Sequence, residues 1–236
     1  MKKKIRAVIA VALLGVLVFS GLKIWTETEA YRGESDLHKQ LLQLKPMPSV
    51  EPAVNQGILD LQSQNSDLAG WLTVPGTQID YPFVQAADND FYLRRDFNGA
   101  YALAGTLFMD YRCVKDFTSP NTIIYGHHMR NGSMFGTMKK FRDKDFFAAN
   151  RTAVIYLPDK TYTVDLFAFM VVRSDDAILY DHEPDDGFLA YVEQNARHYR
   201  DIGATIDDRF VTLSTCAYEF DNARMVLIGR IKDSKR

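Results

Sequence analysis

The sequence predicts a mainly β domain, and three observations support this fold class. From Gly70 onward, short runs rich in β-branched and aromatic residues alternate with Gly, Pro, Asn and Asp, which are typical of turns. The chain has 236 residues, enough for one sizeable domain and its appendages, and eight such runs follow one another in it. Eight strands in one domain predict a closed or nearly closed barrel. The expected strands are 71–74, 81–84, 106–110, 122–125, 153–157, 161–172, 210–215 and 225–231.

The chain begins with a basic segment and a long apolar run. Lysines and an arginine fill most of residues 2–6, and residues 7–22 are apolar. This pattern fits either a cleaved signal peptide or an uncleaved signal anchor. We expect an anchor over residues 1–25, because no A-x-A-type site follows the run and Lys23 and Trp25 suit a membrane interface. The lysines before the span predict a cytoplasmic N-terminus, with the rest of the chain outside.

Residues 26–68 are expected to form a helical extension. A partial apolar face over 26–44 and apolar residues at helical spacing over 54–65 predict two helices, and the three prolines of 45–52 predict a linker between them.

Two further helices are expected among the strands. Residues 133–147 and 186–199 carry apolar side chains at helical spacing. The second helix lies inside the long connection 174–209, just before the strand 210–215. A connection of this length in a compact domain is usually functional.

Composition narrows the class of protein. The formal net charge is −2, so there is no basic bias toward a nucleic-acid partner. The two cysteines, Cys113 and Cys216, do not form a disulfide framework. A bridge between them is an alternative, but we expect Cys113 to be a free structural thiol.

Residues at the ends of three predicted strands suggest a catalytic site. The β-branched run 211–216 ends in Cys216, and Arg224 opens the next apolar run. An accessible thiol at a strand end is a candidate nucleophile, although an unpaired cysteine is also commonly a small buried hydrophobic residue. Upstream, the strand 121–125 is followed by Gly126 and then His127, an imidazole that a glycine exit could aim at a neighbouring strand end.

These motifs resemble those of the sortase family, and more closely those of class B sortases. The TLSTC run, the arginine eight residues on and the YGHH strand carry the resemblance, which extends from about Ala69 to Lys232. It implies an eight-stranded sortase-type β-barrel over residues 69–236, with N-terminal helices and a helix in the long connection before the Cys strand. Further matching stretches are Ile79–Pro82, Asp88–Asn89 and Phe108–Tyr111.

The resemblance implies an acyl transfer through a thioester. Cys216 would attack a peptide carbonyl, His127 would exchange protons with the leaving and incoming amines, and Arg224 would stabilise the oxyanion. His128 is expected to be structural. Ser214 shares a face of its strand with Cys216, and its hydroxyl could bond the substrate backbone. The expected substrate-binding residues are Asn89, Ser214, Tyr180 and Ile178.

The resemblance also implies the partners. Class B sortases cleave a C-terminal sorting signal of the NPQTN kind after its threonine, on proteins that have been secreted. They join the threonine to an amine of the peptidoglycan precursor, outside a Gram-positive membrane. No cofactor and no metal are expected.

Three alternatives come from other classes. His127, His128 and Cys216 could bind a metal, but their spacing matches no zinc pattern. A papain-like peptidase would place its cysteine before its histidine, whereas here the histidine comes first. A membrane-anchored non-catalytic cell-wall scaffold is the third. Within the enzyme class, a cysteine endopeptidase that only hydrolyses is a further alternative.

Overall fold

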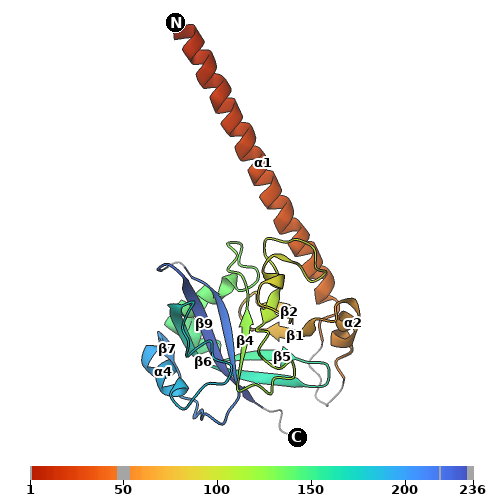
Figure 1. Cartoon of the computed structure of the whole chain (residues 1–236), viewed down its shortest axis with the longest axis vertical. Coiled ribbons are helices and arrows are strands. Elements are labelled where there is room, and N and C mark those ends of the chain that lie inside the picture. Colours follow the sequence, from red (N-terminus) through yellow and green to blue (C-terminus); the bar gives the residue numbers. More distant parts are fainter. Residues whose placement is uncertain (1, 47–53, 218, 233–236) are drawn as a thin grey trace. The chain divides into compact units, whose positions relative to one another are not determined.

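The computed structural model describes residues 2–46, 54–217 and 219–232 (Figure 1). Contacts within the chain divide it into two units, residues 1–40 and 41–236. Most of the expected linker 45–52 lies outside the described residues. Each unit is described by itself below.

The first unit consists of most of helix α1 (Lys2–Leu42). Its large apolar side chains from Ile9 to Trp25 are more than half exposed. In the part of the chain that the structure describes, this is the one helix long and apolar enough to cross a membrane. The apolar run of a signal sequence near an N-terminus meets the same criteria, so this property fits both interpretations of the N-terminus.

The second unit contains a closed barrel of eight strands. The strand order is β5-β1-β2-β3-β4-β8-β9-β6, and pairing of β5 with β6 closes the ring. All eight strands predicted from the sequence are therefore confirmed within the described residues. Their bounds are β1 (Leu68–Thr73), β2 (Asp80–Val84), β3 (Leu107–Met109), β4 (Asn121–Tyr125), β5 (Thr152–Tyr156), β6 (Thr161–Arg173), β8 (Phe210–Cys216) and β9 (Ala223–Lys232).

Strands β4, β8 and β9 bring distant parts of the sequence to one end of the barrel. Strand β4 runs parallel to β8, with Tyr125 opposite Ser214, and β8 runs antiparallel to β9, with Cys216 opposite Arg224. Because β4 and β8 are parallel, their carboxyl ends meet at the same edge of the sheet. The residues that follow Tyr125 therefore lie beside the end of the cysteine strand.

The helices differ in part from the expectation. Helix α2 (Gln56–Gln64) forms as predicted. Residues 133–147 were expected to form one helix, but the backbone is extended at Asp143 and separates the 3-10 helix η2 (Gly136–Arg142) from helix α3 (Lys144–Ala149). The carboxylate of Asp143 accepts a hydrogen bond from the Phe146 N–H and caps the start of α3. A further 3-10 helix, η1, spans Phe91–Arg94.

The helix of the long connection is also shorter than expected. Helix α4 (Phe188–Asn195) ends because Ala196 is extended. The following residues form β7 (His198–Tyr199), which pairs with β6 outside the ring. The prediction of a helix before the cysteine strand is confirmed, but not its extension to residue 199.

The core has two parts. The barrel interior is filled by aliphatic and aromatic side chains from every strand of the ring. A second cluster lies between α4 and the outer faces of β6, β8 and β9, and includes Phe188, Phe210 and Leu179. These strands are therefore buried on both faces, which explains their nearly continuous apolar sequences. The second cluster fixes the long connection to the barrel wall that carries Cys216.

Candidate active site

A cavity of about 420 Å³ opens where β4, β8 and β9 meet, between the segment 89–93 and the start of the long connection. It brings together His127, Cys216 and Arg224, as well as three of the four expected substrate-binding residues. The residues that line it are Asn89, Asp90, Leu93, Phe108, Asp110, Arg112, Tyr125, Gly126, His127, Ser174, Tyr180, Ser214, Thr215, Cys216 and Arg224.

Cys216 is the last residue of β8, and its side chain is half-buried. Both Cys216 and Cys113 are free thiols, so the alternative of a bridge between them is wrong. Cys113 is buried, and this burial raises the pKa of its thiol to about 11, which keeps it protonated and unreactive at neutral pH. Only Cys216 of the two lines the cavity.

Arg224 lies on β9, directly opposite Cys216 on β8. In an antiparallel pair, residues in direct register point to the same face, so the guanidinium and the thiol share one side of the sheet. One guanidinium nitrogen donates to the Ala223 carbonyl at 3.0 Å, and the same carbonyl accepts from the Ala217 N–H at 2.9 Å. Arginine has five N–H donors, and this contact engages one of them.

The His127 ring is held by the backbone of η1. Its Nε2 lies 2.7 Å from the Leu93 carbonyl, and because a carbonyl can only accept, Nε2 carries the proton. Nδ1 is then the nitrogen that can take up or release a proton. Burial lowers the pKa of His127 below its ordinary value, against the opposite effect of the hydrogen bond to Leu93, and the nearby charge of Arg94 lowers it further. The neutral imidazole is therefore favoured near pH 7, in the state that accepts a proton.

Gly126 precedes His127 because no side chain fits there. A Cβ at this position would lie 2.3 Å from a methyl carbon of Leu107 and 2.8 Å from the ring of Phe135. Glycine is thus required because side chains of the barrel interior pack closely against this position. This contact holds the backbone from which His127 enters the cavity.

His128 does not line the cavity and supports the cysteine strand instead. Its Nδ1 lies 3.0 Å from the Cys216 carbonyl, which makes Nδ1 the protonated nitrogen. Burial lowers the pKa of His128, although the bond to Cys216 opposes this effect. The nitrogens of the two histidines thus engage carbonyls of different segments, η1 for His127 and β8 for His128. Among the described residues, no group of three or more His, Cys, Asp or Glu side chains is placed to hold a metal ion.

Ser214 and Tyr180 meet inside the cavity. The Tyr180 hydroxyl lies 2.8 Å from the Ser214 hydroxyl, and the Tyr180 ring stacks on Tyr125 with 6.1 Å between ring centroids. Burial raises the pKa of Tyr180 to about 12, so the phenol stays protonated. Inside the cavity, the long connection therefore contacts the cysteine strand through the Tyr180 hydroxyl.

The other two expected substrate-binding residues have different surroundings. Asn89 lines the cavity, but its amide donates to Asp110 and accepts from the Tyr111 N–H, both at 3.1 Å. Ile178 is 41% exposed and does not line this cavity. It lines a second cavity, of about 580 Å³, on the other side of the connection, together with Tyr191 and Phe220.

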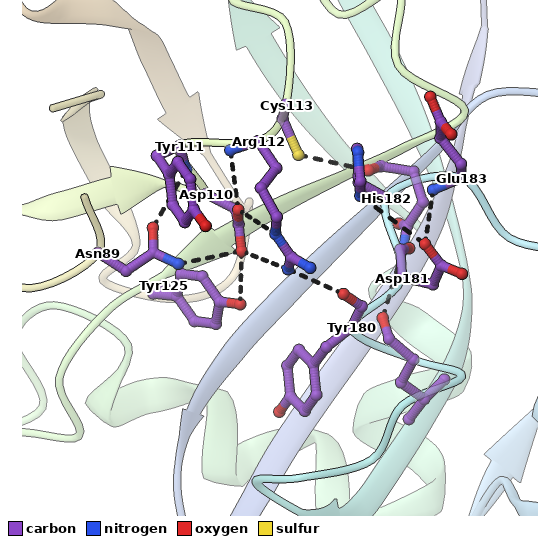
Figure 2. A network of polar contacts seen from close by, with 12 residues as sticks. Asn89, Asp110, Tyr111, Arg112, Cys113, Tyr125, Tyr180, Asp181, His182 and Glu183 are labelled. Atoms are coloured by element: carbon purple, nitrogen blue, oxygen red, sulfur yellow. Dashed lines mark hydrogen bonds and ion pairs between the residues drawn. The ribbon is translucent and has the colours of Figure 1, made fainter. Parts of the chain in front are cut away.

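Sequence reasoning missed an ion pair in the cavity wall, between the buried Asp110 and the partly exposed Arg112 (Figure 2). Arg112 donates to both carboxylate oxygens, from Nε at 2.9 Å and from Nη2 at 2.8 Å. Asn89 and the Tyr125 hydroxyl also donate to the fully buried carboxylate, at 3.1 and 3.0 Å. Burial by itself would raise the pKa of Asp110, but the bonds from Arg112 and Asn89 outweigh it and hold the pKa below its ordinary value. The sequence signal was the position of Asp110 directly after a buried apolar strand. A carboxylate buried there requires a partner of opposite charge.

A closed eight-stranded barrel with a cysteine ending one strand, an arginine beside it and a histidine after a third strand is the arrangement found in sortase-type cysteine transpeptidases. The sortase domain family model matches residues 72–232. Sortase B of Listeria monocytogenes is 34% identical over 233 residues, which cover 94% of this chain and 95% of that relative.

Solved structures agree with this comparison. Sortase B from Bacillus anthracis has a TM-score of 0.76 and 32% identity, covering 88% of this chain and all of that structure. A Staphylococcus aureus sortase B–substrate complex has a TM-score of 0.77 and 25% identity, covering 89% of this chain and all of that structure. The chain belongs to the sortase family of cysteine transpeptidases, in class B.

Proposed function

We propose that this class B sortase is a membrane-anchored transpeptidase that cleaves the C-terminal sorting signal of secreted proteins after a threonine. It then joins the threonine carboxyl to an amine of the peptidoglycan precursor. The observation that carries the proposal is the direct pairing of Cys216 with Arg224 at a cavity that His127 also lines. These three residues supply a nucleophile, an electrostatic group and a proton carrier.

The first half-reaction forms a thioester. Neutral His127 takes the thiol proton of Cys216 at Nδ1, and the sulfur attacks the threonine carbonyl. The resulting oxyanion needs a donor, and the Ala217 N–H is already engaged by the Ala223 carbonyl. Arg224, with its remaining N–H donors, is the group that would stabilise this charge. The imidazolium of His127 then gives its proton to the leaving amine as the peptide bond breaks.

The second half-reaction joins the acceptor. An incoming amine attacks the thioester carbonyl, His127 removes a proton from its nitrogen, and the Cys216 sulfur leaves and is reprotonated. The new peptide bond replaces the thioester, so the sequence of steps requires no oxidant, reductant or cofactor. Positioning the amine beside the thioester is what allows it to compete with water.

The sorting signal would bind along the wall formed by Tyr180 and Ser214. Both hydroxyls face the cavity that contains Cys216, where they can bond to a peptide backbone. Asn89 would contribute from the opposite segment, and Ile178 would contact only a part of the substrate that extends past Tyr180 into the second cavity. The relative from Staphylococcus aureus whose structure is a substrate complex supports a peptide site in this fold.

The apolar part of α1 would anchor the enzyme in the membrane, with the N-terminus in the cytoplasm and the barrel outside. The length and apolar composition of the helix support a membrane span, and the basic residues before the span support this orientation. The full chain should then remain with membranes after carbonate extraction. Protease added outside intact protoplasts should digest the barrel, whereas a secreted form that begins near Leu22 would show that the segment is cleaved.

The experiment that tests the function separates transpeptidation from hydrolysis. The full chain in detergent is incubated with peptides that contain candidate sorting signals, with and without peptidoglycan stem or cross-bridge amines, and products are identified by mass spectrometry. Ligated product should rise with amine concentration and should be absent with Cys216→Ala. Hydrolysis that no acceptor amine changes would instead establish the peptidase alternative.

A further inference from the structure

Four consecutive backbone carbonyls of the long connection, residues 179–182, accept hydrogen bonds from the barrel. The Asn121 amide nitrogen lies 3.3 Å from the Leu179 carbonyl and 2.8 Å from the Asp181 carbonyl. Arg112 Nη2 donates to the Tyr180 carbonyl at 3.0 Å, and the Asn121 N–H donates to the His182 carbonyl at 3.2 Å. Figure 2 shows Arg112 between Asp110 and the backbone of Tyr180. Each of these four carbonyls of an irregular segment thus has a hydrogen-bond donor.

The two residues that hold this segment are themselves fixed. Arg112 is bound at two atoms to the buried carboxylate of Asp110, which directly follows β3. Asn121 is fully buried at the start of β4, and its side-chain oxygen accepts from the Thr212 hydroxyl at 2.8 Å. Thr212 lies on β8, the strand that ends in Cys216. Asn121 therefore links the connection to the cysteine strand by hydrogen bonds to both.

The outer side of the segment is fixed as well. The Asp176 carboxylate accepts from the backbone N–H groups of Ile178 and Leu179, and from the Tyr191 hydroxyl of α4 at 2.6 Å. Between these two attachments, Tyr180 is the residue whose side chain enters the cavity. Its ring rests on Tyr125 and its hydroxyl meets Ser214.

We propose that Arg112 and Asn121 are positioning residues that hold Tyr180 against Ser214 and thereby set the enzyme's affinity for its sorting signal. This inference rests on the proposed role of Tyr180 in the substrate groove. Arg112 acts through the Tyr180 carbonyl, and Asn121 acts through the carbonyls on either side of it. Neither residue takes part in the bond-making steps at Cys216.

The order that these hydrogen bonds give to the segment is tested by hydrogen–deuterium exchange of the full chain in detergent. Arg112→Ala and Asn121→Ala should raise exchange in peptides covering residues 176–184. Arg200 gives a matched control, because it also donates to two backbone carbonyls, those of Leu166 and Phe147, but does not line the cavity. Arg200→Ala should leave exchange over residues 176–184 unchanged. Unchanged exchange there in both the Arg112 and Asn121 variants would overturn the proposal.

A double-mutant cycle on peptide cleavage tests the route through Tyr180. Arg112→Ala should raise KM about tenfold with a smaller change in kcat, as expected for loss of one charged hydrogen bond. Combined with Tyr180→Phe, it should add little to the loss caused by the stronger single change. Arg112→Lys keeps the charge beside Asp110 but lacks the fork that reaches Tyr180, so it should fold and still show the raised KM. Arg200→Ala and Tyr180→Phe should be additive.

The outcomes separate this inference from the function on which it rests. A transpeptidase and a peptidase both cleave the peptide. The double-mutant cycle can therefore be interpreted for either kind of enzyme. Additive losses for Arg112→Ala and Tyr180→Phe would mean that Arg112 binds substrate directly, and would overturn only the positioning role. Unchanged kinetics in Tyr180→Phe, while Cys216→Ala is inactive, would overturn both the groove role of Tyr180 and the positioning proposal.

Discussion

Cys216 and Arg224 are register partners across β8 and β9, so the thiol and the guanidinium lie opposite each other on one face of the sheet. Arg224 comes eight positions after Cys216 in sequence, and the antiparallel pairing of β8 with β9 places the two residues directly opposite each other. The pairing places a permanent positive charge beside the atom that would attack the substrate. It also fixes the face of the sheet from which the Arg224 side chain extends, because its backbone is paired along the strand.

Replacing Arg224 by lysine should lower kcat for sorting-peptide cleavage by about 100-fold or more, because lysine lacks the planar set of donors. Steady-state cleavage of a sorting peptide measures the loss. Arg230 lies on the same strand but pairs with Asp165 and does not line the cavity, so Arg230→Lys is the matched control and should keep nearly full activity. Equal activity of the two variants would remove Arg224 from the proposed mechanism.

The two cysteines should respond in opposite ways to substitution. Cys216→Ala should abolish formation of the acyl-enzyme, seen as a mass increase of the protein after mixing with peptide. Cys113→Ala should keep most activity and lose about 1 kcal/mol of stability, because the buried thiol fills space and donates a weak hydrogen bond to the Asn121 carbonyl at 3.5 Å. Product release by Cys216→Ala would contradict the thioester mechanism.

Much of the fold was accessible from the sequence because the strands are strongly patterned and bounded by turn residues. The eight predicted runs correspond to β1–β6, β8 and β9, and the motif residues at 127, 216 and 224 line one cavity. Strand ends are local features, and a barrel brings them together by topology alone. The error at Asp143 is a missed local signal, because its carboxylate caps the Phe146 N–H three residues on and so divides an expected helix.

The connection that forms the groove wall could not be predicted in the same way. Its path depends on Arg112 and Asn121, which lie about 60 residues or more before it and bind its carbonyls rather than its side chains. Hydrogen bonds to backbone carbonyls carry no signature in the sequence of the segment that accepts them. For the same reason, Tyr180 and Ile178 looked equivalent in the sequence, yet they line different cavities.

Replacing His128 should weaken catalysis without abolishing it, because its Nδ1–H holds the carbonyl of Cys216 rather than the thiol. His128→Ala should lower kcat about tenfold, since one hydrogen bond that orients the end of β8 is lost. His128→Asn places an amide donor near the position of Nδ1 and should recover most of that loss, whereas the Gln variant places it too far away. The rate of acylation in single-turnover experiments measures the effect. Equal rates for the Ala and Asn variants would exclude a positioning bond.

The Asp110–Arg112 pair should make stability depend on pH in a defined direction. The folded-state pKa of Asp110 is lower than its unfolded value of about 3.9, because the bonds from Arg112 and Asn89 outweigh the effect of burial. The unfolded chain therefore binds the proton more readily. The contribution of Asp110 is fully present above about pH 4 and is lost as the pH falls through the folded-state pKa.

Urea unfolding of the full chain in detergent, measured from pH 7 down to pH 3, should show this loss in the wild type. Asp110→Asn should cost about 2 kcal/mol at pH 7, because the buried side chain loses the charge that strengthens its hydrogen bonds with Arg112 and Asn89, and the difference from wild type should shrink as the pH falls below 4. Asp175 offers a matched control: Arg173 binds it through Nε and Nη2 at 2.9 and 3.0 Å, in the same two-bond geometry and also two residues away in sequence, but in solvent. Exposed pairs contribute little, so Asp175→Asn should leave both the stability at pH 7 and its slope with pH unchanged. If the difference between wild type and Asp110→Asn stayed constant from pH 7 to pH 3, the carboxylate would not be the group that couples this pair to pH.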